Sequence, residues 1–113
     1  MHEVGIMQSV IALAEQQARD AGAVQIHEVR LRIGRLSGVV PVALETAFAI
    51  LRPGTLAAEA SLTIDEVPAA CGCGTCQQEF AAEEWLDACP RCGAVSVHLR
   101  RGREMELASL EIS

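Results

Sequence analysis

Apolar residues near the start of the chain recur at steps of three and four positions, which is the spacing of an amphipathic helix. The segment begins at Ile6, ends before Gly22, and carries these residues on one face: Ile6, Val10, Leu13, Ala14 and Ala18. Glycine is typical of the position that follows the last turn of a helix. The pattern therefore predicts a first helix over residues 6–21.

Between residues 27 and 33 the spacing changes to a strict alternation of apolar and polar side chains. Val29, Leu31 and Ile33 would share one face of a strand, and the charged residues between them would share the other. The glycine-containing stretch 34–38 ends the alternation. We therefore expect a half-buried strand after the first helix.

A second helix is predicted to begin at Pro41, because a proline in the first turn loses no intrahelical hydrogen bond. The apolar stripe of this helix consists of Leu44, Ala47, Phe48 and Leu51. Such a stripe is typical of a helix that packs against a core along one side. The pair Pro53-Gly54 ends the helix.

Two further strands are expected, over about residues 61–67 and 104–112. In the last of them, Met105 and Leu107 share one parity, whereas Leu110 and Ile112 have the other. A β-bulge near residues 108–109 would explain the change.

Four cysteines are arranged as two Cys-x2-Cys pairs with twelve residues between them: Cys73, Cys76, Cys89 and Cys92. Two tight turns can present four such sulfurs tetrahedrally, and Zn²⁺ prefers four thiolates at about 2.3 Å. Gly93 can adopt the positive φ that the turn needs after the second pair. A structural zinc site is the favoured interpretation, and a disulfide pair or a rubredoxin-like iron site is the alternative.

The cysteine segment, residues 69–100, is shorter than the roughly 40 residues below which a chain rarely folds without metal, disulfides or a partner. We therefore predict a zinc ribbon over 69–100, inserted into a discontinuous α+β domain of residues 1–68 plus 101–113. That domain would have two helices on one face of a three-stranded sheet. A chain of 113 residues has the length of one domain, or of one small domain that carries a metal-stapled insert.

The composition and charge of the chain disfavour several classes of function. No stretch approaches the roughly 20 apolar residues of a membrane span, so we expect a cytoplasmic protein whose thiols stay reduced. The formal net charge is −6, which disfavours nucleic-acid binding. The basic cluster Arg100, Arg101 and Arg103 is interpreted as a solvated turn, in preference to a track for phosphates. We find no grouping of a nucleophile, a base and an orienting group, so no catalysis is expected.

The amino terminus reads Met1-His2-Glu3 and offers a second metal site. A free α-amine has a pKa near 8, and with the next backbone amides it can form five-membered chelate rings around a metal. The imidazole of His2 would complete a plane of four nitrogens, which suits Ni²⁺ or Cu²⁺.

Several motifs together resemble the HypA/HybF family of nickel metallochaperones for [NiFe]-hydrogenase maturation. They are Met1-His2-Glu3, the stretch 33–38, Ala47-Phe48, the two cysteine pairs, Gly102-x-Glu104 and Ser109-Leu110-Glu111. The resemblance implies nickel at Met1, His2 and Glu3, and structural zinc on Cys73, Cys76, Cys89 and Cys92. It also implies two partners, the maturation GTPase HypB and the hydrogenase large-subunit precursor. Some relatives carry histidine beside the cysteine pairs, where this chain has Gln78 and Gly93.

Two other classes of protein stay open at this point: a zinc-ribbon module that binds nucleic acid or protein, and a small iron electron carrier. Cys71 is interpreted as a spare buried thiol, although it lies close enough to Cys73 to be an alternative ligand. His27 is expected at a strand edge, and His98 is expected to be exposed.

Overall fold

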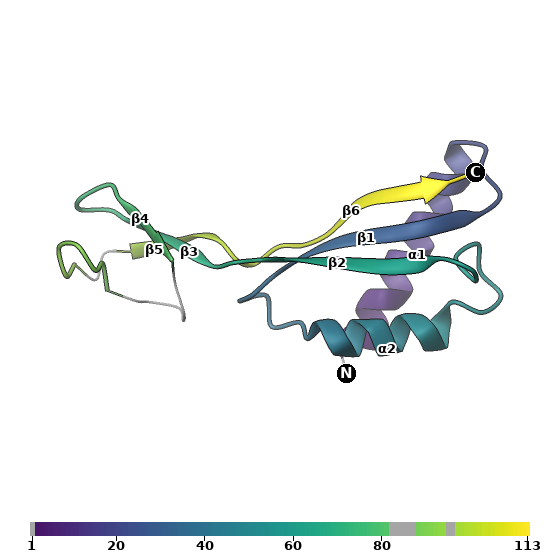
Figure 1. The fold of residues 1–113 in the computed structure, drawn as a ribbon, viewed down its shortest axis with the longest axis horizontal. Helices are drawn as coiled ribbons and strands as arrows, with labels where there is room; N and C mark the ends of the chain where they lie inside the picture. The colour runs from purple at the N-terminus through teal and green to yellow at the C-terminus, as the bar shows by residue number, and fades with distance from the viewer. Residues whose placement is uncertain (1, 82–87, 95–96) are drawn as a thin grey trace. The chain divides into compact units, whose positions relative to one another are not determined.

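A computed structural model describes residues 2–81, 88–94 and 97–113 of the chain (Figure 1). Within these residues there are two helices and six strands. In chain order they are α1 (His2–Asp20), β1 (Ile26–Gly34), α2 (Pro41–Leu51), β2 (Ser61–Val67), β3 (Ala70–Cys73), β4 (Glu79–Ala81), β5 (Val97–Arg101) and β6 (Met105–Ile112). No helix in the described ranges is both long enough and apolar enough to cross a membrane.

The chain divides into two compact units. Unit 1 consists of Met1–Arg32, Val39–Asp65 and Glu106–Ser113, and unit 2 consists of Ile33–Gly38 and Glu66–Met105. Unit 2 therefore contains the cysteine segment together with flanking residues on either side. Whether residues 69–100 fold as a domain apart from 1–68 plus 101–113 stays a prediction.

Unit 1 is built on a three-stranded sheet with the order β2-β1-β6 (Figure 1). Helices α1 and α2 pack against each other and supply most of its buried apolar side chains. These are Met7, Ile11, Ala14 and Ala18 of α1, and Leu44, Ala47 and Phe48 of α2. The stripe predicted for α2 is confirmed at Leu44, Ala47 and Phe48. The stripe predicted for the first helix is wrong in part, because Leu13 is 48% exposed, whereas Met7 and Ile11 are buried beside Ala14 and Ala18. The buried face of α1 still follows helical spacing, but it is rotated from the predicted one.

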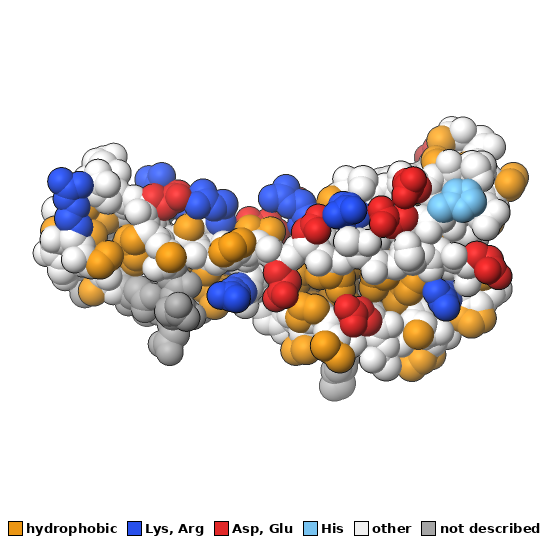
Figure 2. All heavy atoms as spheres, in the orientation of Figure 1, with side chains coloured by type: hydrophobic (Ala, Val, Ile, Leu, Met, Phe, Trp, Pro, Cys, Tyr) orange, Lys and Arg blue, Asp and Glu red, His pale blue; other side chains and the backbone are white. Residues whose placement is uncertain are grey.

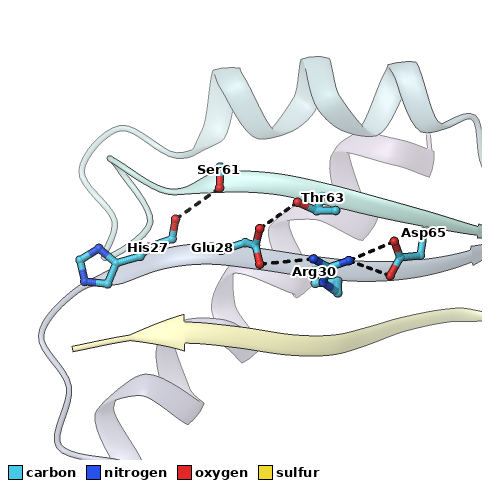
Figure 3. Close-up of polar contacts among 6 residues, drawn as sticks. All are labelled: His27, Glu28, Arg30, Ser61, Thr63 and Asp65. Atoms are coloured by element: carbon cyan, nitrogen blue, oxygen red, sulfur yellow. Dashed lines mark hydrogen bonds and ion pairs between the residues drawn. The ribbon is translucent and has the colours of Figure 1, made fainter.

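The polar side chains of β1 form a chain of contacts along the sheet (Figure 3). Arg30 donates to both carboxylate oxygens of Asp65 at 3.1 Å and lies 3.7 Å from Glu28. The Thr63 hydroxyl donates to Glu28 at 3.0 Å. The Arg30–Asp65 ion pair and the Thr63–Glu28 hydrogen bond join β1 to β2, which supports one register over its alternatives.

The alternation in β1 is confirmed, since Val29, Leu31 and Ile33 are buried. At the start of the strand Ile26 is buried and His27 is exposed. The His27 Nε2 atom lies 2.6 Å from the Ser113 hydroxyl, as fits a histidine at a strand edge. In β6, Leu107, Leu110 and Ile112 are all half-buried, so burial changes parity between residues 107 and 110 as predicted.

Helix α1 begins at His2, four residues before the predicted Ile6. The prediction began at the first residue of the apolar stripe, whereas an acidic side chain in the first turn, here Glu3, favours an earlier start. Helix α2 begins at Pro41, as predicted, and Val40 is its N-cap.

Unit 2 contains a second sheet, with the order β4-β3-β5 and both pairs antiparallel. Among the residues that the structure describes there, Ala69 and Cys71 are buried in an apolar cluster, and Leu36, Phe80 and Leu99 pack against it.

A close approach of two glycine backbones fixes the path of the chain in unit 2. The Gly34 N–H donates to the Glu104 carbonyl at 2.7 Å, and the Leu36 N–H donates to the Gly102 carbonyl at 2.6 Å. A Cβ on Gly34 would overlap the carbonyl group of Gly102. Only glycine fits at position 34 without a backbone shift.

Candidate metal centre

The two cysteine pairs lie on turns with nearly the same backbone geometry. In the first turn the Gln77 N–H donates to the Cys73 carbonyl at 3.0 Å, and in the second the Gly93 N–H donates to the Cys89 carbonyl at 2.8 Å. The residue after each pair has a positive φ, 62° at Gln77 and 74° at Gly93. The expected conformation of Gly93 is therefore found, and the first turn forces the same conformation on a residue with a side chain.

The turns bring all four sulfur atoms within 4.8 Å of one another. The Cys73 and Cys92 sulfurs are 3.6 Å apart, and so are those of Cys76 and Cys89, so each close contact joins the two turns. Four sulfurs at about 2.3 Å from a tetrahedral zinc ion would be about 3.8 Å apart. The cluster therefore fits a closed Cys₄ zinc site, with no position left for a substrate.

The surroundings of the thiols favour deprotonation at one cysteine of each turn. The pKa of Cys73 is lowered to about 6, chiefly because the Cys76 N–H donates to its sulfur at 3.5 Å. The pKa of Cys89 is lowered in the same way by the Cys92 N–H. Desolvation raises the pKa of Cys76 to about 11. Thiolates are thus available for the first bonds to a metal, and binding releases the remaining protons.

Cys71 is buried on the same strand as Cys73 and lies outside the cluster. It packs in the apolar core of unit 2, beside Ala69. The structure therefore favours the interpretation of Cys71 as a buried thiol over that of an alternative ligand.

At the amino terminus, Met1 and the His2 side chain lie outside the part of the chain that the structure describes. Glu3 is described, and its carboxylate accepts a hydrogen bond from the Val40 N–H at 3.5 Å. The pKa of Glu3 is lowered, chiefly by its own backbone N–H and further by that of Val40. Glu3, the residue after His2, therefore contacts the start of α2. The two residues of this contact are 37 positions apart, so no local pattern in the sequence predicts it.

The basic cluster is partly neutralised. Arg101 forms two hydrogen bonds with Glu79, at 3.0 and 2.6 Å, and Arg100 lies 3.9 Å from the same carboxylate. Sequence reasoning did not connect Glu79 with these arginines, because the contact depends on β4 and β5 lying on either side of β3. His98 is exposed, as expected, and its ring lies over Gly72.

The two units therefore define the class of this protein. Unit 1 is an α+β unit, and unit 2 is a ribbon unit with a Cys₄ cluster suited to zinc. The chain is similar over its full length to curated hydrogenase maturation factors. It is 43% identical over 112 residues to HypA of a Picosynechococcus species and 42% identical to HypA of Geobacter sulfurreducens, and each alignment covers 99% of both chains.

Two solved structures have the same fold. The solution structure of the Ni metallochaperone HypA from Helicobacter pylori matches with a TM-score of 0.70 at 29% identity, over 97% of this chain and 96% of that one. A solution structure of HypA protein matches with a TM-score of 0.76 at 30% identity, over 100% of this chain and 97% of that one.

Residues 1–112 match the family described as hydrogenase/urease nickel incorporation, metallochaperone, HypA. The chain belongs to this family. It is a metallochaperone, a protein that carries a metal and catalyses no reaction, as the sequence predicted.

Proposed function

We propose that this chain binds Ni(II) at its amino terminus and delivers it, with a GTPase partner, to the precursor of the [NiFe]-hydrogenase large subunit. The observation that carries the proposal is the match of residues 1–112 to a family of nickel-incorporation metallochaperones. The sequence Met1-His2-Glu3 supports it, because it supplies a set of nitrogen donors within three residues.

The nickel ligands would be the α-amine of Met1, the imidazole of His2 and the first backbone amides, with Glu3 completing the site. Nitrogen donors in a plane suit Ni(II). The start of α1 at His2 supports this arrangement, since the first four N–H groups of a helix have no acceptor within the helix. These amides can lose their protons to a metal without breaking the helix.

The position of Glu3 supports a role in shaping the site. Its carboxylate accepts from its own N–H and from the Val40 N–H, which ties the first turn of α1 to the N-cap of α2. If nickel binds the Glu3 amide nitrogen, the amide proton would pass to solvent and that amide could no longer donate. The carboxylate would then keep the contact with Val40 or turn to the metal.

For Cys73, Cys76, Cys89 and Cys92 we propose structural zinc. When bound, zinc would cross-link the two turns and hold the short strands of unit 2 together. The closed donor set and the 3.6 Å contacts between turns support this role.

The proposed partners are the maturation GTPase HypB and the hydrogenase large-subunit precursor, and the proposed compartment is the cytoplasm. A reducing compartment keeps the four thiols available for metal. Both partners are suggested by the family to which the chain belongs and by the names of its relatives, which are hydrogenase maturation factors.

The test is a hydrogenase-producing bacterium that lacks its own member of the family. The unaltered chain should restore nickel-dependent hydrogenase activity, and His2→Ala should not. His27→Ala is the matched control, because His27 is exposed near the start of β1 and its ring forms a hydrogen bond with the Ser113 hydroxyl. Equal restoration by His2→Ala and by the unaltered chain would refute delivery from the amino terminus.

A further inference from the structure

Arginine side chains gather on unit 2, in a chain whose formal net charge is −6. Three of them line one pocket of about 210 Å³, together with Leu99 and Glu104. They are Arg100, Arg101 and Arg103. One oxygen of the Glu104 carboxylate accepts from the Gly102 N–H at 2.8 Å. Among the described residues of the lining, three arginines face one carboxylate, so this part of the pocket has a net positive charge.

A register shift between β3 and β5 brings the side chains of Arg100 and Arg101 to the same carboxylate, that of Glu79. Cys71 pairs with Leu99 and Ala70 pairs with Arg101, so the register between β3 and β5 shifts and Arg100 is the extra residue. In a regular strand, Arg100 and Arg101 would point to opposite faces. The shift re-aims a side chain, as β-bulges do, and both guanidinium groups reach Glu79.

The Arg101–Glu79 pair lies at the surface, with side-chain exposures of 50% and 37%. Exposed ion pairs contribute little to stability, because both groups are well solvated when they separate. A carboxylate from another protein could therefore replace Glu79 on Arg101 at little cost to the fold.

Arg101 also lines a second pocket, of about 250 Å³, which is mainly apolar. Its remaining lining consists of Pro68, Ala69, Ala70, Glu79, Phe80 and Ala81. Basic and apolar side chains also lie next to each other on this unit in the space-filling view (Figure 2). The two pockets thus present a cationic surface beside an apolar one.

We propose that these two pockets form a docking surface for an acidic segment of a partner protein. Carboxylates of the segment bind Arg100, Arg101 and Arg103, and a neighbouring apolar side chain enters the pocket beside Phe80. A nucleic acid fits less well, because the acidic chain around the pockets repels a long polyanion. The inference concerns unit 2 alone and does not depend on nickel delivery.

The test uses zinc-loaded protein and a dye-labelled peptide in which glutamates flank a central leucine. Fluorescence anisotropy should show binding that weakens with salt, and the same peptide with glutamines should bind at least about tenfold more weakly. Arg100→Gln and Arg103→Gln should each weaken binding about fivefold. Glu79→Gln should strengthen it, because the carboxylate that forms two hydrogen bonds with Arg101 is then removed.

Two matched controls separate the pockets from the overall charge. Arg35→Gln removes a cation from unit 2 outside both pockets, and Glu106→Gln removes an acid from unit 1. Neither should change the affinity by more than about twofold. Zinc content and the amide NMR spectrum establish that each variant is folded.

Four results would overturn the proposal. They are equal affinity for the glutamine peptide, equal loss in Arg35→Gln and Arg103→Gln, weaker binding by Glu79→Gln, and tighter binding of a dye-labelled oligouridine than of the acidic peptide. Self-association of the protein that blocks the peptide would overturn it as well.

Discussion

Replacing Cys73 and Cys71 by alanine, one at a time, separates the contribution of the metal from that of packing. Both residues lie on β3, two positions apart and therefore on the same face, and both are buried, with exposures of 1% and 2%. Each change removes one sulfur atom from a buried position. Only Cys73 belongs to the four-sulfur cluster.

The two variants should differ by several kcal/mol. Losing a buried sulfur costs about 1 kcal/mol in packing, and this cost is common to both. Structural zinc supplies on the order of 10–16 kcal/mol of apparent binding free energy in small domains, so one ligand in four corresponds to about 2.5–4 kcal/mol. That loss is comparable with the total stability of a small domain, about 5 kcal/mol at the low end. Cys73→Ala should therefore unfold unit 2.

Zinc content and amide NMR spectra measure the two effects. Cys71→Ala should keep about one zinc per chain and a dispersed spectrum, with a modest drop in melting temperature. Cys73→Ala should lose zinc, and the amide signals of β3 and β5 should collapse toward unfolded positions. Loss of zinc from Cys71→Ala, or full retention by Cys73→Ala, would refute the assigned ligand set.

Three further predictions concern the backbone and the amino terminus. With zinc in fixed excess, Gln77→Gly should stabilise the protein to urea by about 1 kcal/mol, because it removes a side chain from a positive φ, and Gly93→Ala should destabilise it by a similar amount. Destabilisation by Gln77→Gly, or stabilisation by Gly93→Ala, would contradict the reasoning. Gly34→Ala should cost about 2 kcal/mol or more in thermal unfolding, whereas Gly5→Ala, which meets open space in α1, should add about 0.5–1 kcal/mol; equal effects would contradict the close approach. Because the pKa of Glu3 is lowered in the folded chain, its contribution to stability is full above the ordinary glutamate pKa and is lost as pH falls through the folded pKa. Glu3→Gln should flatten this part of the pH–stability curve, and an unchanged curve would contradict the contact with α2.

Much of the fold was predictable because it depends on local periodicity. The helical spacing of Leu44 and Phe48 and the alternation of Val29 and Leu31 each identify an element from its own residues. The four-cysteine cluster was predictable for a similar reason. Each cysteine turn is specified by five consecutive residues. The twelve residues between the two Cys-x2-Cys pairs leave few ways for the turns to bind one metal other than together.

The remaining features depend on how separate elements pair. The arginines of β5 meet Glu79 only because β3 lies between β4 and β5 and because the register shifts at Ala70. The contact between Glu3 and Val40 needs α1 and α2 side by side. Neither the strand order nor the helix pairing has a local signal in the sequence, so these contacts could not be derived from it.

The most direct test of the account is a Ni²⁺ titration of protein that begins at Met1, beside protein with one glycine added before Met1. The addition displaces the α-amine from its chelate ring and leaves every side chain in place. The account predicts tight binding of one Ni²⁺, with the absorption of a planar nitrogen site, in the first protein only. Zinc content and the amide spectrum should be the same in both. Equally tight Ni²⁺ binding by the two proteins would contradict the central claim, that nickel is carried at the amino terminus.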